Sequence, residues 1–500
     1  MHLPPSPGFT MCAVARPATS GEPDDPRCVA GLFPTWLRVP ASLLLSVGLA
    51  AVATARPVPI PDPGFGGPGG IARIAFDVGA DARDFACAAV IDGARPVLAG
   101  LASTDAGVDA AFVRLDAGGV PDPAFGSAGD GRVSAGLAPA YPHGDLHLAR
   151  ALDGRLPYLA HAPNLAAAIV GRLHGDGKID TSFNGSGHRF LGPGFFVDGG
   201  IEVQLSRVLP DADGGVLVLG AALRMTSTAT PQICQAVGRL TVAGATDTRF
   251  GNGRGSICVA PSRPGQPDRA MAYDGALLAD GRIVLAGVAE RAGGSGLDMS
   301  VIRLLPDGRL DPSFGPGHDG WAYVGFDQGG DMTDAAFAVT VDAAGRIVLA
   351  GTVRRPTSWE IGVARLLPSG DPDPAFGLDG RVLLGYAQYG YLPTSFSVYA
   401  LAGDRILVGG STSDTLDSYF QGFAAVLTST GRIDPRFGEG GLFVHDALGA
   451  PAAGVMQTAR VVLDGDHLYL IGDLRDQQSS TNTDFAATRF VLPLFHSDFE

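Results

Sequence analysis

Asp311-Pro-Ser-Phe-Gly315 is one of seven copies of the pattern Asp-(Pro/Thr)-x-Phe in this 500-residue chain, and the copies return at intervals of 58 to 67 residues. A period of this length, repeated this often, is typical of a ring or array of β units. Asp can bond the backbone two residues ahead, Pro fixes φ and the following Gly accepts a positive φ, so the motif predicts a turn. Its Phe is then expected to fill apolar space between neighbouring units. We interpret the motif as scaffold, formed by Asp62 and Phe65, Asp122 and Phe125, Asp180 and Phe183, Asp247 and Phe250, Asp311 and Phe314, Asp373 and Phe376, and Asp434 and Phe437.

Short apolar runs bounded by glycine surround each motif. Gly281-Arg-Ile-Val-Leu-Ala-Gly287 returns unchanged as Gly345-Arg-Ile-Val-Leu-Ala-Gly351, and a run such as Ile361-Gly-Val-Ala-Arg-Leu-Leu367 follows ten to twenty residues later. Such β-branched and aliphatic runs read as buried strands. With one strand after the motif and one before the next glycine turn, each unit is predicted to be a meander of four strands.

The number of units predicts how the chain closes. The first motif, at Asp62, has no strand before it, and the last strand, 484–491, has no motif after it. These halves complete each other if the chain ends meet, whereas an open solenoid would leave two strand edges exposed. We therefore predict an all-β fold: a seven-bladed β-propeller with four antiparallel strands per blade, closed by pairing of the N- and C-terminal segments.

An arginine precedes the motif Phe by eleven residues in five successive copies. A ring of arginines that binds an anion is one interpretation. Pairing of each Arg with its motif Asp is the stronger one, because the guanidinium fork suits a carboxylate. Val426 takes this place in the sixth copy and Arg489 takes it in the seventh strand; the five arginines are Arg114, Arg172, Arg239, Arg303 and Arg365.

These motifs resemble the delta-60 β-propeller repeat of bacterial exported proteins. The resemblance rests on the Asp-Pro-x-Phe-Gly turn, the Arg-Ile-Val-Leu-Ala-Gly strand and the Val-Ala-Arg-Leu strand, and covers about residues 57–493. His161 departs from the pattern, because it stands where a strand-ending glycine is expected. The resemblance implies a propeller of undefined biochemical role and brings no catalytic residues with it.

The first 55 residues read as a leader and signal peptide. Arg38 precedes the apolar stretch 39–52, and Ala53-Thr-Ala55 supplies a small-residue cleavage site. We expect a mature chain from about Arg56 that is exported to the periplasm, the cell surface or the medium, with no later membrane span. The predicted propeller then occupies residues 57–493, and a short tail occupies residues 494–500.

The charge and the cysteine and histidine content limit the kinds of partner and cofactor that the sequence predicts. A formal net charge of −15 disfavours a nucleic-acid partner. Cys234 and Cys258 are expected to lie on successive strands and are candidates for a disulfide in an oxidising compartment, although spacing alone does not establish the geometry of a bridge. Cys87 lies in an apolar run and is interpreted as a small buried residue. Five histidines between residues 143 and 188 match no compact zinc spacing, so no metal site and no cofactor is predicted.

Meander topology sends two sets of loops to opposite faces, and one set differs from unit to unit. Aromatic residues gather in those variable loops, which favours a binding site for a carbohydrate or a protein around Trp359, Tyr389, Tyr391 and Tyr419. Coverage of the blade ends is the alternative role for these residues. No serine-nucleophile or zinc-protease motif occurs, and no catalytic residue is assigned.

The sequence therefore favours a binding or interaction module over an enzyme. An extracytoplasmic polysaccharide hydrolase or lyase with a site at the central channel is the first alternative, because residues from different blades would leave no linear motif. A structural envelope protein is the second. The oligomeric state is left open.

Overall fold

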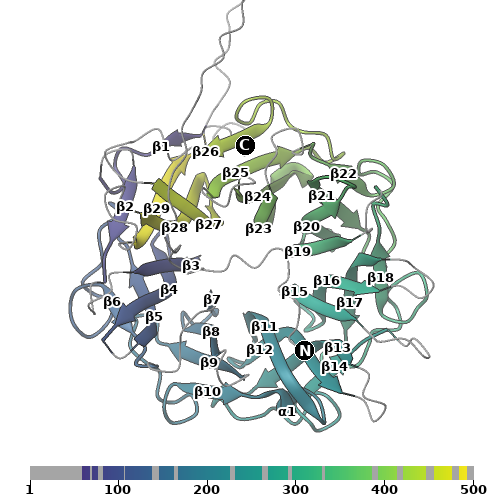
Figure 1. The fold of residues 1–500 in the computed structure, drawn as a ribbon, viewed down its shortest axis with the longest axis horizontal. Coiled ribbons are helices and arrows are strands. Elements are labelled where there is room, and N and C mark those ends of the chain that lie inside the picture. Colours follow the sequence, from purple (N-terminus) through teal and green to yellow (C-terminus); the bar gives the residue numbers. More distant parts are fainter. Residues whose placement is uncertain are drawn as a thin grey trace, which may run out of the picture.

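The computed structural model is a ring of seven antiparallel sheets around a central channel, six with four strands and one with five (Figure 1). The described residues are 59–67, 70–76, 83–105, 107–137, 146–162, 167–225, 231–261, 269–290, 296–328, 333–385, 392–413, 420–445, 455–475 and 483–492. The predicted leader and tail lie outside these ranges. The predicted seven-bladed propeller is confirmed.

Each blade is a meander whose first strand lies innermost. Blades 1 to 3 are β3 (Asp84–Ile91), β4 (Pro96–Thr104), β5 (Gly107–Arg114) and β6 (Arg132–Ser134); β7 (Leu146–Leu148), β8 (Leu156–Ala162), β9 (Ala167–Leu173) and β10 (His188–Leu191); and β11 (Gly200–Pro210), β12 (Val216–Met225), β13 (Pro231–Leu240) and β14 (Ser256–Val259), with the short helix α1 (Pro193–Phe196) between blades 2 and 3.

Blades 4 to 6 repeat this plan. They are β15 (Ala270–Leu277), β16 (Ile283–Glu290), β17 (Leu297–Leu304) and β18 (Trp321–Val324); β19 (Asp334–Val341), β20 (Ile347–Arg354), β21 (Trp359–Leu366) and β22 (Arg381–Leu383); and β23 (Leu392–Ala400), β24 (Ile406–Ser413), β25 (Phe420–Leu427) and β26 (Leu442–His445), with the 3-10 turn η3 (Ala402–Asp404) in blade 6.

Blade 7 joins the two ends of the chain. Its strands β27 (Val455–Asp464), β28 (His467–Arg475) and β29 (Thr483–Val491) come from the C-terminal part, and β2 (Ile71–Ile74) and β1 (Ile60–Pro61) from the N-terminal part pair with β29. Ile71 lies opposite Thr488 and Ile60 opposite Val491. In Figure 1 the purple β1 and β2 lie beside the yellow β29. This pairing satisfies the strand edge that an open array would expose.

The hydrophobic core lies between blades. Every motif Phe is at most 1 % exposed. In six of the seven motifs, the residue after the Phe donates its backbone N–H to a turn carbonyl of the next blade, as Gly315 does to Ser369 at 2.7 Å. Glycine lies in the middle of the second strand, and does not end it as the sequence pattern suggested, because a Cβ at Gly351 would collide with the carbonyl oxygen of Ala335 on the innermost strand. These features explain why the repeat keeps its Phe and its glycines.

The sequence-based placement of His161 at that glycine position is wrong: Arg172 pairs with Pro157 as Arg365 pairs with Val348, so Ala160 takes the glycine register in blade 2 and His161 follows it. The described ladder between β7 and β8 reaches Ala160, opposite Leu146, and ends before His161. The imidazole Nε2 of His161 lies 2.5 Å from the carbonyl oxygen of Leu205 in blade 3. The histidine that departs from the repeat pattern therefore makes a contact between blades 2 and 3.

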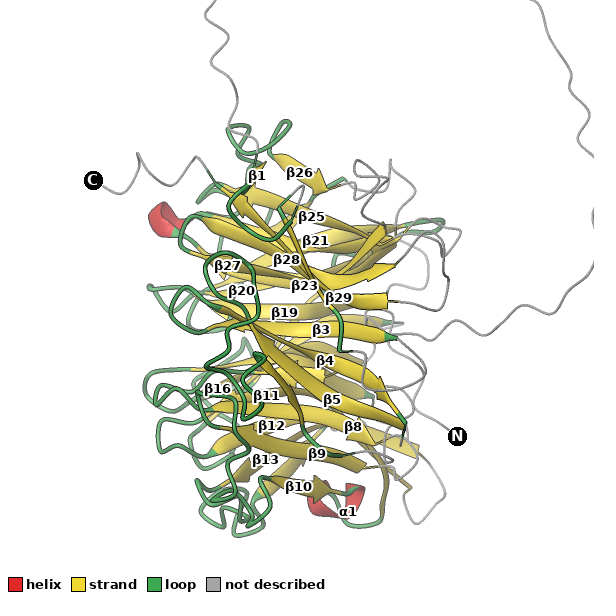
Figure 2. Cartoon of the chain, turned by 90° about the vertical axis from the view of Figure 1, so that its left-hand side faces the viewer, coloured by secondary structure: helices red, strands yellow, loops and turns green. Residues whose placement is uncertain are grey.

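The propeller has two unlike faces. The "turn face" carries the short turns between the first and second strands of each blade together with the motif turns; the "variable face" lies opposite. Figure 2 shows the described turns gathered along one edge of the strands. The seven motifs thus lie on one face, and Trp359, at the start of β21, lies at the other.

Candidate functional site

Arginine–aspartate pairs occupy the turn face of six blades. Arginine Nε lies 2.7 to 3.3 Å from a motif Asp oxygen in these blades. In five of them the guanidinium also covers the motif Phe, 4.6 to 5.0 Å from the ring centroid. The pairs are Arg114–Asp122, Arg172–Asp180, Arg239–Asp247, Arg303–Asp311, Arg365–Asp373 and Arg489–Asp62.

Each such arginine connects parts of the scaffold. Arg303 is 5 % exposed, and its Nη1 donates to the carbonyl oxygen of Pro368 in the next blade, 2.5 Å away. Burial by itself would raise the pKa of Asp311, but hydrogen bonds from Ser313 and Arg303 outweigh it and lower that pKa to about 2. The carboxylate thus stays ionised, and the arrangement acts as a staple that holds the motif turn to its strand and its neighbour.

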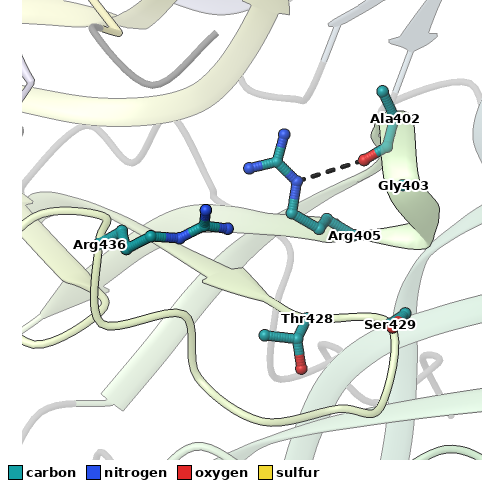
Figure 3. A pocket seen from close by; sticks show the side chains of 6 residues that line it. All are labelled: Ala402, Gly403, Arg405, Thr428, Ser429 and Arg436. Atoms are coloured by element: carbon teal, nitrogen blue, oxygen red, sulfur yellow. Dashed lines mark hydrogen bonds between the residues drawn. The ribbon is translucent and has the colours of Figure 1, made fainter. Parts of the chain in front are cut away.

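Blade 6 lacks this staple. Val426 stands at the arginine position, and Asp434 is held by Arg436, whose Nε and Nη2 donate to Oδ1 and Oδ2 at 3.0 and 2.8 Å. Beside them lies a pocket of about 310 Å³ lined by Ala402, Gly403, Arg405, Thr428, Ser429 and Arg436. Figure 3 shows the guanidinium groups of Arg405 and Arg436 projecting into this pocket from two different turns.

The central channel contains a second group of charged side chains. All seven innermost strands line a cavity of about 320 Å³ that includes Arg207, Asp274, Arg460, Ser397 and Tyr399. Asp274 accepts hydrogen bonds from Arg207 Nε at 2.5 Å, from the backbone N–H of Gly275 at 2.8 Å and from that of Val339 at 2.9 Å. These bonds tie the third, fourth and fifth blades together around the channel.

Histidine extends this polar arrangement into blade 2. His147 Nδ1 lies 3.4 Å from Nη1 of Arg207. Burial, together with the positive charges of Arg207 and Arg460, lowers the pKa of His147 well below its usual value. His147 is therefore neutral at physiological pH.

Trp359 is the one predicted ligand-binding residue that lies within the described ranges; Tyr389, Tyr391 and Tyr419 fall outside them. Trp359 is half-buried and pairs with Arg354 across β20 and β21, and the guanidinium lies 4.6 Å from the centroid of its ring. The backbone N–H of Arg354 donates to Asp334 at 3.3 Å. An aromatic ring is thus held by its own sheet at the variable face.

Two further predicted features can be placed. Cys234 and Cys258 are bonded as a disulfide between β13 and β14. Of the clustered histidines, His147 and His161 point between blades 2 and 3. Within the described ranges, no group of three or more His, Cys, Asp and Glu side chains is arranged to hold a metal ion.

Sequence reasoning missed the charged residues of the channel. Arg207, Asp274 and Arg460 occupy the same register on three innermost strands, where blades 1 and 5 have Ala88 and Ala338. An alignment of the repeats on the glycine within the second strand would have revealed them. Their proximity required the ring to close.

Similarity to a known family covers part of the chain. A family model described as "Domain of unknown function (DUF5122) beta-propeller" matches residues 278–314 and 345–376. The match supports a propeller of unknown function, while the delta-60 name stays a resemblance. A search of curated protein sequences gives no significant match.

Solved structures with similar folds are distant in sequence. A polysaccharide lyase, Uly1, has a TM-score of 0.44 and 10 % identity, with 81 % of this chain and 90 % of that chain covered. A protein of unknown function from Dyadobacter fermentans has a TM-score of 0.39 and 10 % identity, with 85 % and 99 % covered. Drosophila Plexin A in complex with Semaphorin 1b has a TM-score of 0.35 and 8 % identity, with 82 % and 88 % covered. Similarity at this level carries no argument about function.

Proposed function

We propose that the protein is an exported binding module that contacts its ligand through the variable face. The observation that carries the proposal is the Trp359 ring, held in place by Arg354 and left partly accessible at that face. Aromatic side chains supply large contact areas at low conformational cost, and for this reason they are enriched at binding surfaces. The staples of the opposite face support this role, since they provide a rigid scaffold and leave the variable loops to differ.

The ligand we propose is a carbohydrate or a protein surface. Trp359 offers an apolar ring beside the cationic Arg354, and the ion pair of Arg355 with Glu360, at 2.7 Å, adds polar groups to the same edge of blade 5. An apolar ring rimmed by polar groups suits both the faces of sugar rings and the side chains of a partner protein. Tyr389, Tyr391 and Tyr419 are proposed to extend this surface from the neighbouring loops.

The second candidate is a polysaccharide lyase that uses the channel. Hydrolysis of a glycosidic bond normally needs two carboxyl groups that flank the bond. Among the described residues that line the channel cavity, Asp274 is the single carboxylate, and both of its oxygens accept hydrogen bonds. An elimination from an acidic sugar needs cations to neutralise the sugar carboxylate and a base to remove a proton. Arg207, Arg460 and the neutral His147 are groups of those kinds.

Ligand screening of the mature chain from Arg56 tests the first proposal. We expect a glycan array or a partner screen to give binding without turnover, and we expect Trp359→Ala to weaken that binding at least tenfold. Phe190→Ala is the matched control, because Phe190 is an exposed aromatic residue (49 %) on β10, the outermost strand of blade 2. Equal losses in both variants would refute the assignment to the variable face.

Turnover of an acidic polysaccharide would instead favour the channel. In that outcome His147→Ala should abolish the reaction while Trp359→Ala retains its chemical step. N-terminal sequencing of protein recovered outside the cytoplasm tests export separately, and a start at or near Arg56 is the expected result. Full-length protein retained in the cytoplasm would contradict the proposed localisation.

A further inference from the structure

A pocket of about 500 Å³ lies beside β14, the outermost strand of blade 3. Ile257 and Val259 of this strand pack in the core between blades 3 and 4. Cys258, between them, packs on the opposite side, against the cluster that contains Phe196 of α1. Since side chains alternate between the two faces of a strand, the pocket extends around the free edge of β14. The apolar residues that line it include Phe196, Val197, Ile257, Val259, Ala260 and Leu310.

The walls of this pocket are held by the surrounding scaffold. The hydroxyl group of Ser256 on β14 donates to the carbonyl oxygen of Phe195 in α1 at 2.5 Å. The disulfide between Cys234 and Cys258 joins β14 to the third strand, β13. Figure 1 shows α1 at the outer rim of the ring, beside blade 3. A ligand would therefore meet a site that is already formed, as is usual for small-molecule pockets.

A positive charge lies at one side of the pocket. Arg254 is neutralised, because its Nη1 and Nη2 donate to the two oxygens of Asp198 at 2.9 and 2.8 Å. Arg224 donates its Nε to the neutral side-chain oxygen of Gln232 at 2.9 Å, and within the described part of the chain it forms no ion pair. The hydrogen bond from Arg254 is the largest cause that lowers the pKa of Asp198, and the charge of Arg224 acts in the same direction. The three charged side chains among the described lining residues therefore carry one net positive charge.

Blade 5 has an arginine at the same place together with a carboxylate. Arg224 and Arg355 each follow the glycine within the second strand by four residues. Arg355 pairs with Glu360 at 2.7 Å. Gln232 gives Arg224 a hydrogen bond but no opposite charge. The guanidinium of blade 3 can therefore pair with a carboxylate of a ligand, whereas in blade 5 the protein supplies that carboxylate itself.

We propose that this blade 3 pocket binds a small amphipathic carboxylate, with its apolar chain against β14 and α1 and its carboxylate against Arg224. The planar guanidinium fork suits a carboxylate. Ile257, Val259 and Leu310 are half-buried, so a bound chain would remove further apolar area from water. A volume of about 500 Å³ is within the usual range of small-molecule sites.

This site is separate from the surface of the proposed function. It lies at the outer edge of blade 3, whereas Trp359 lies in blade 5 at the variable face. Trp359→Ala should leave carboxylate binding unchanged, and changes to the pocket should leave binding at the variable face unchanged. The failure of one proposal is therefore distinguishable from the failure of the other.

Titration calorimetry of the mature chain with straight-chain carboxylates, from butanoate to decanoate, tests the proposal. We expect saturable binding whose affinity rises by about fourfold for each added methylene group that becomes buried. The matching primary amides have the same chain and no charge, and they should bind at least tenfold more weakly.

Arg224→Gln should weaken the binding of octanoate at least tenfold and leave that of octanamide within twofold, because it removes the cation alone. Arg309→Gln is the control, since it removes the same charge from an exposed ion pair with Asp307 in blade 4. It should leave both affinities within twofold. Both variants should keep the circular dichroism spectrum of the parent chain.

A second pair of variants tests the apolar part of the site without changing any charge. Val259→Thr keeps the shape of the side chain and should weaken the binding of octanoate and octanamide alike, by at least threefold. Val444→Thr is its control, because Val444 is 40 % exposed on β26, the outermost strand of blade 6. The control should leave both affinities within twofold.

Four results would overturn the proposal. They are the absence of saturable binding by any of the carboxylates, an affinity that does not change with chain length, equal losses in Arg224→Gln and Arg309→Gln, and equal losses in the two valine variants. A trivaline peptide with a free carboxylate distinguishes a peptide end from a small molecule. If it bound more tightly than octanoate, the choice of a small molecule would also be wrong.

Discussion

Blades 5 and 6 are neighbours with the same strand plan and different turn-face chemistry. In blade 5, Arg365 pairs with Asp373 at 2.7 Å and covers Phe376 at 4.6 Å; in blade 6, Val426 occupies that position and Arg436 holds Asp434. The motif Phe is buried in both, and both sheets have the same strand order. Apolar packing and turn glycines therefore maintain the structure of a blade, whereas the charged staple can be rearranged without loss of the strand plan. This rearrangement changes which charged side chains lie at the turn face of the blade.

The largest expected effect follows from breaking the staple of blade 5. Arg365→Ala leaves Asp373, which is 3 % exposed, as a buried carboxylate without its cation. Removal of one partner of a buried pair costs about 3–5 kcal/mol, and we expect a loss of that size in urea unfolding. Arg309→Ala is the control: its exposed side chain pairs with Asp307 at the surface, where such pairs contribute less than about 1 kcal/mol. Equal losses would show that the staple adds nothing beyond surface charge.

A second effect concerns blade 7, at the position after the glycine in the middle of the second strand. Blades 5 and 6 have Thr352 and Ser411 there, and blade 7 has Asp473, which is buried and has one oxygen with no hydrogen-bond partner. Burial raises the pKa of Asp473 to about 7. The folded state thus binds a proton that the unfolded chain releases near pH 3.8.

Because the folded-state pKa is the higher one, this stabilisation is complete below about pH 4 and is lost as pH rises through about 7. The slope contributed by this group approaches about 1.4 kcal/mol per pH unit within that window. Asp473→Ser, which installs the residue type of blade 6, should flatten the profile of unfolding free energy against pH. A profile identical to that of the parent chain would contradict the raised pKa.

A smaller effect should come from converting blade 6 into blade 5. Arg436 corresponds to Ala375, so Val426→Arg combined with Arg436→Ala rebuilds the blade 5 arrangement. We expect the two substitutions to be coupled favourably by about 1 kcal/mol in a double-mutant cycle, since the new arginine restores the charge partner that Asp434 loses. Additive effects would mean that the introduced arginine does not reach Asp434.

The smallest expected effect is that of Trp359→Ala on stability. Trp359 is half-buried at the start of β21, away from the staples. We expect a change within about 1 kcal/mol, mainly from the lost contact with Arg354, as for exposed cation–π pairs. Thermal unfolding measures it, and a loss as large as that of Arg365→Ala would assign Trp359 to the scaffold instead of to a binding surface.

Most of the fold could be predicted because each repeat contains the turn and strand signals of one blade. Seven copies of Asp-(Pro/Thr)-x-Phe set the number of blades, and the unmatched halves at the two ends predicted the closing strand pairing, to which the structure adds the ion pair of Asp62 with Arg489. The contact of His161 with Leu205 could not be foreseen, because it depends on how far the innermost strand of blade 2 extends. Nor could the grouping of Arg207, Asp274 and His147, which lie on three blades separated by more than fifty residues each.

The sequence by itself determined the unit, its number and its scaffold, since these depend on local turn chemistry and on apolar periodicity within about sixty residues. Only the tertiary structure decided which charges meet. Closure of the ring brings side chains from different blades to within hydrogen-bonding distance in the channel. The missing arginine at Val426 becomes a pocket only when the turns of blade 6 bring Arg405 and Arg436 together. Electrostatic interactions act through space, and the distances between repeats are set by the closed ring.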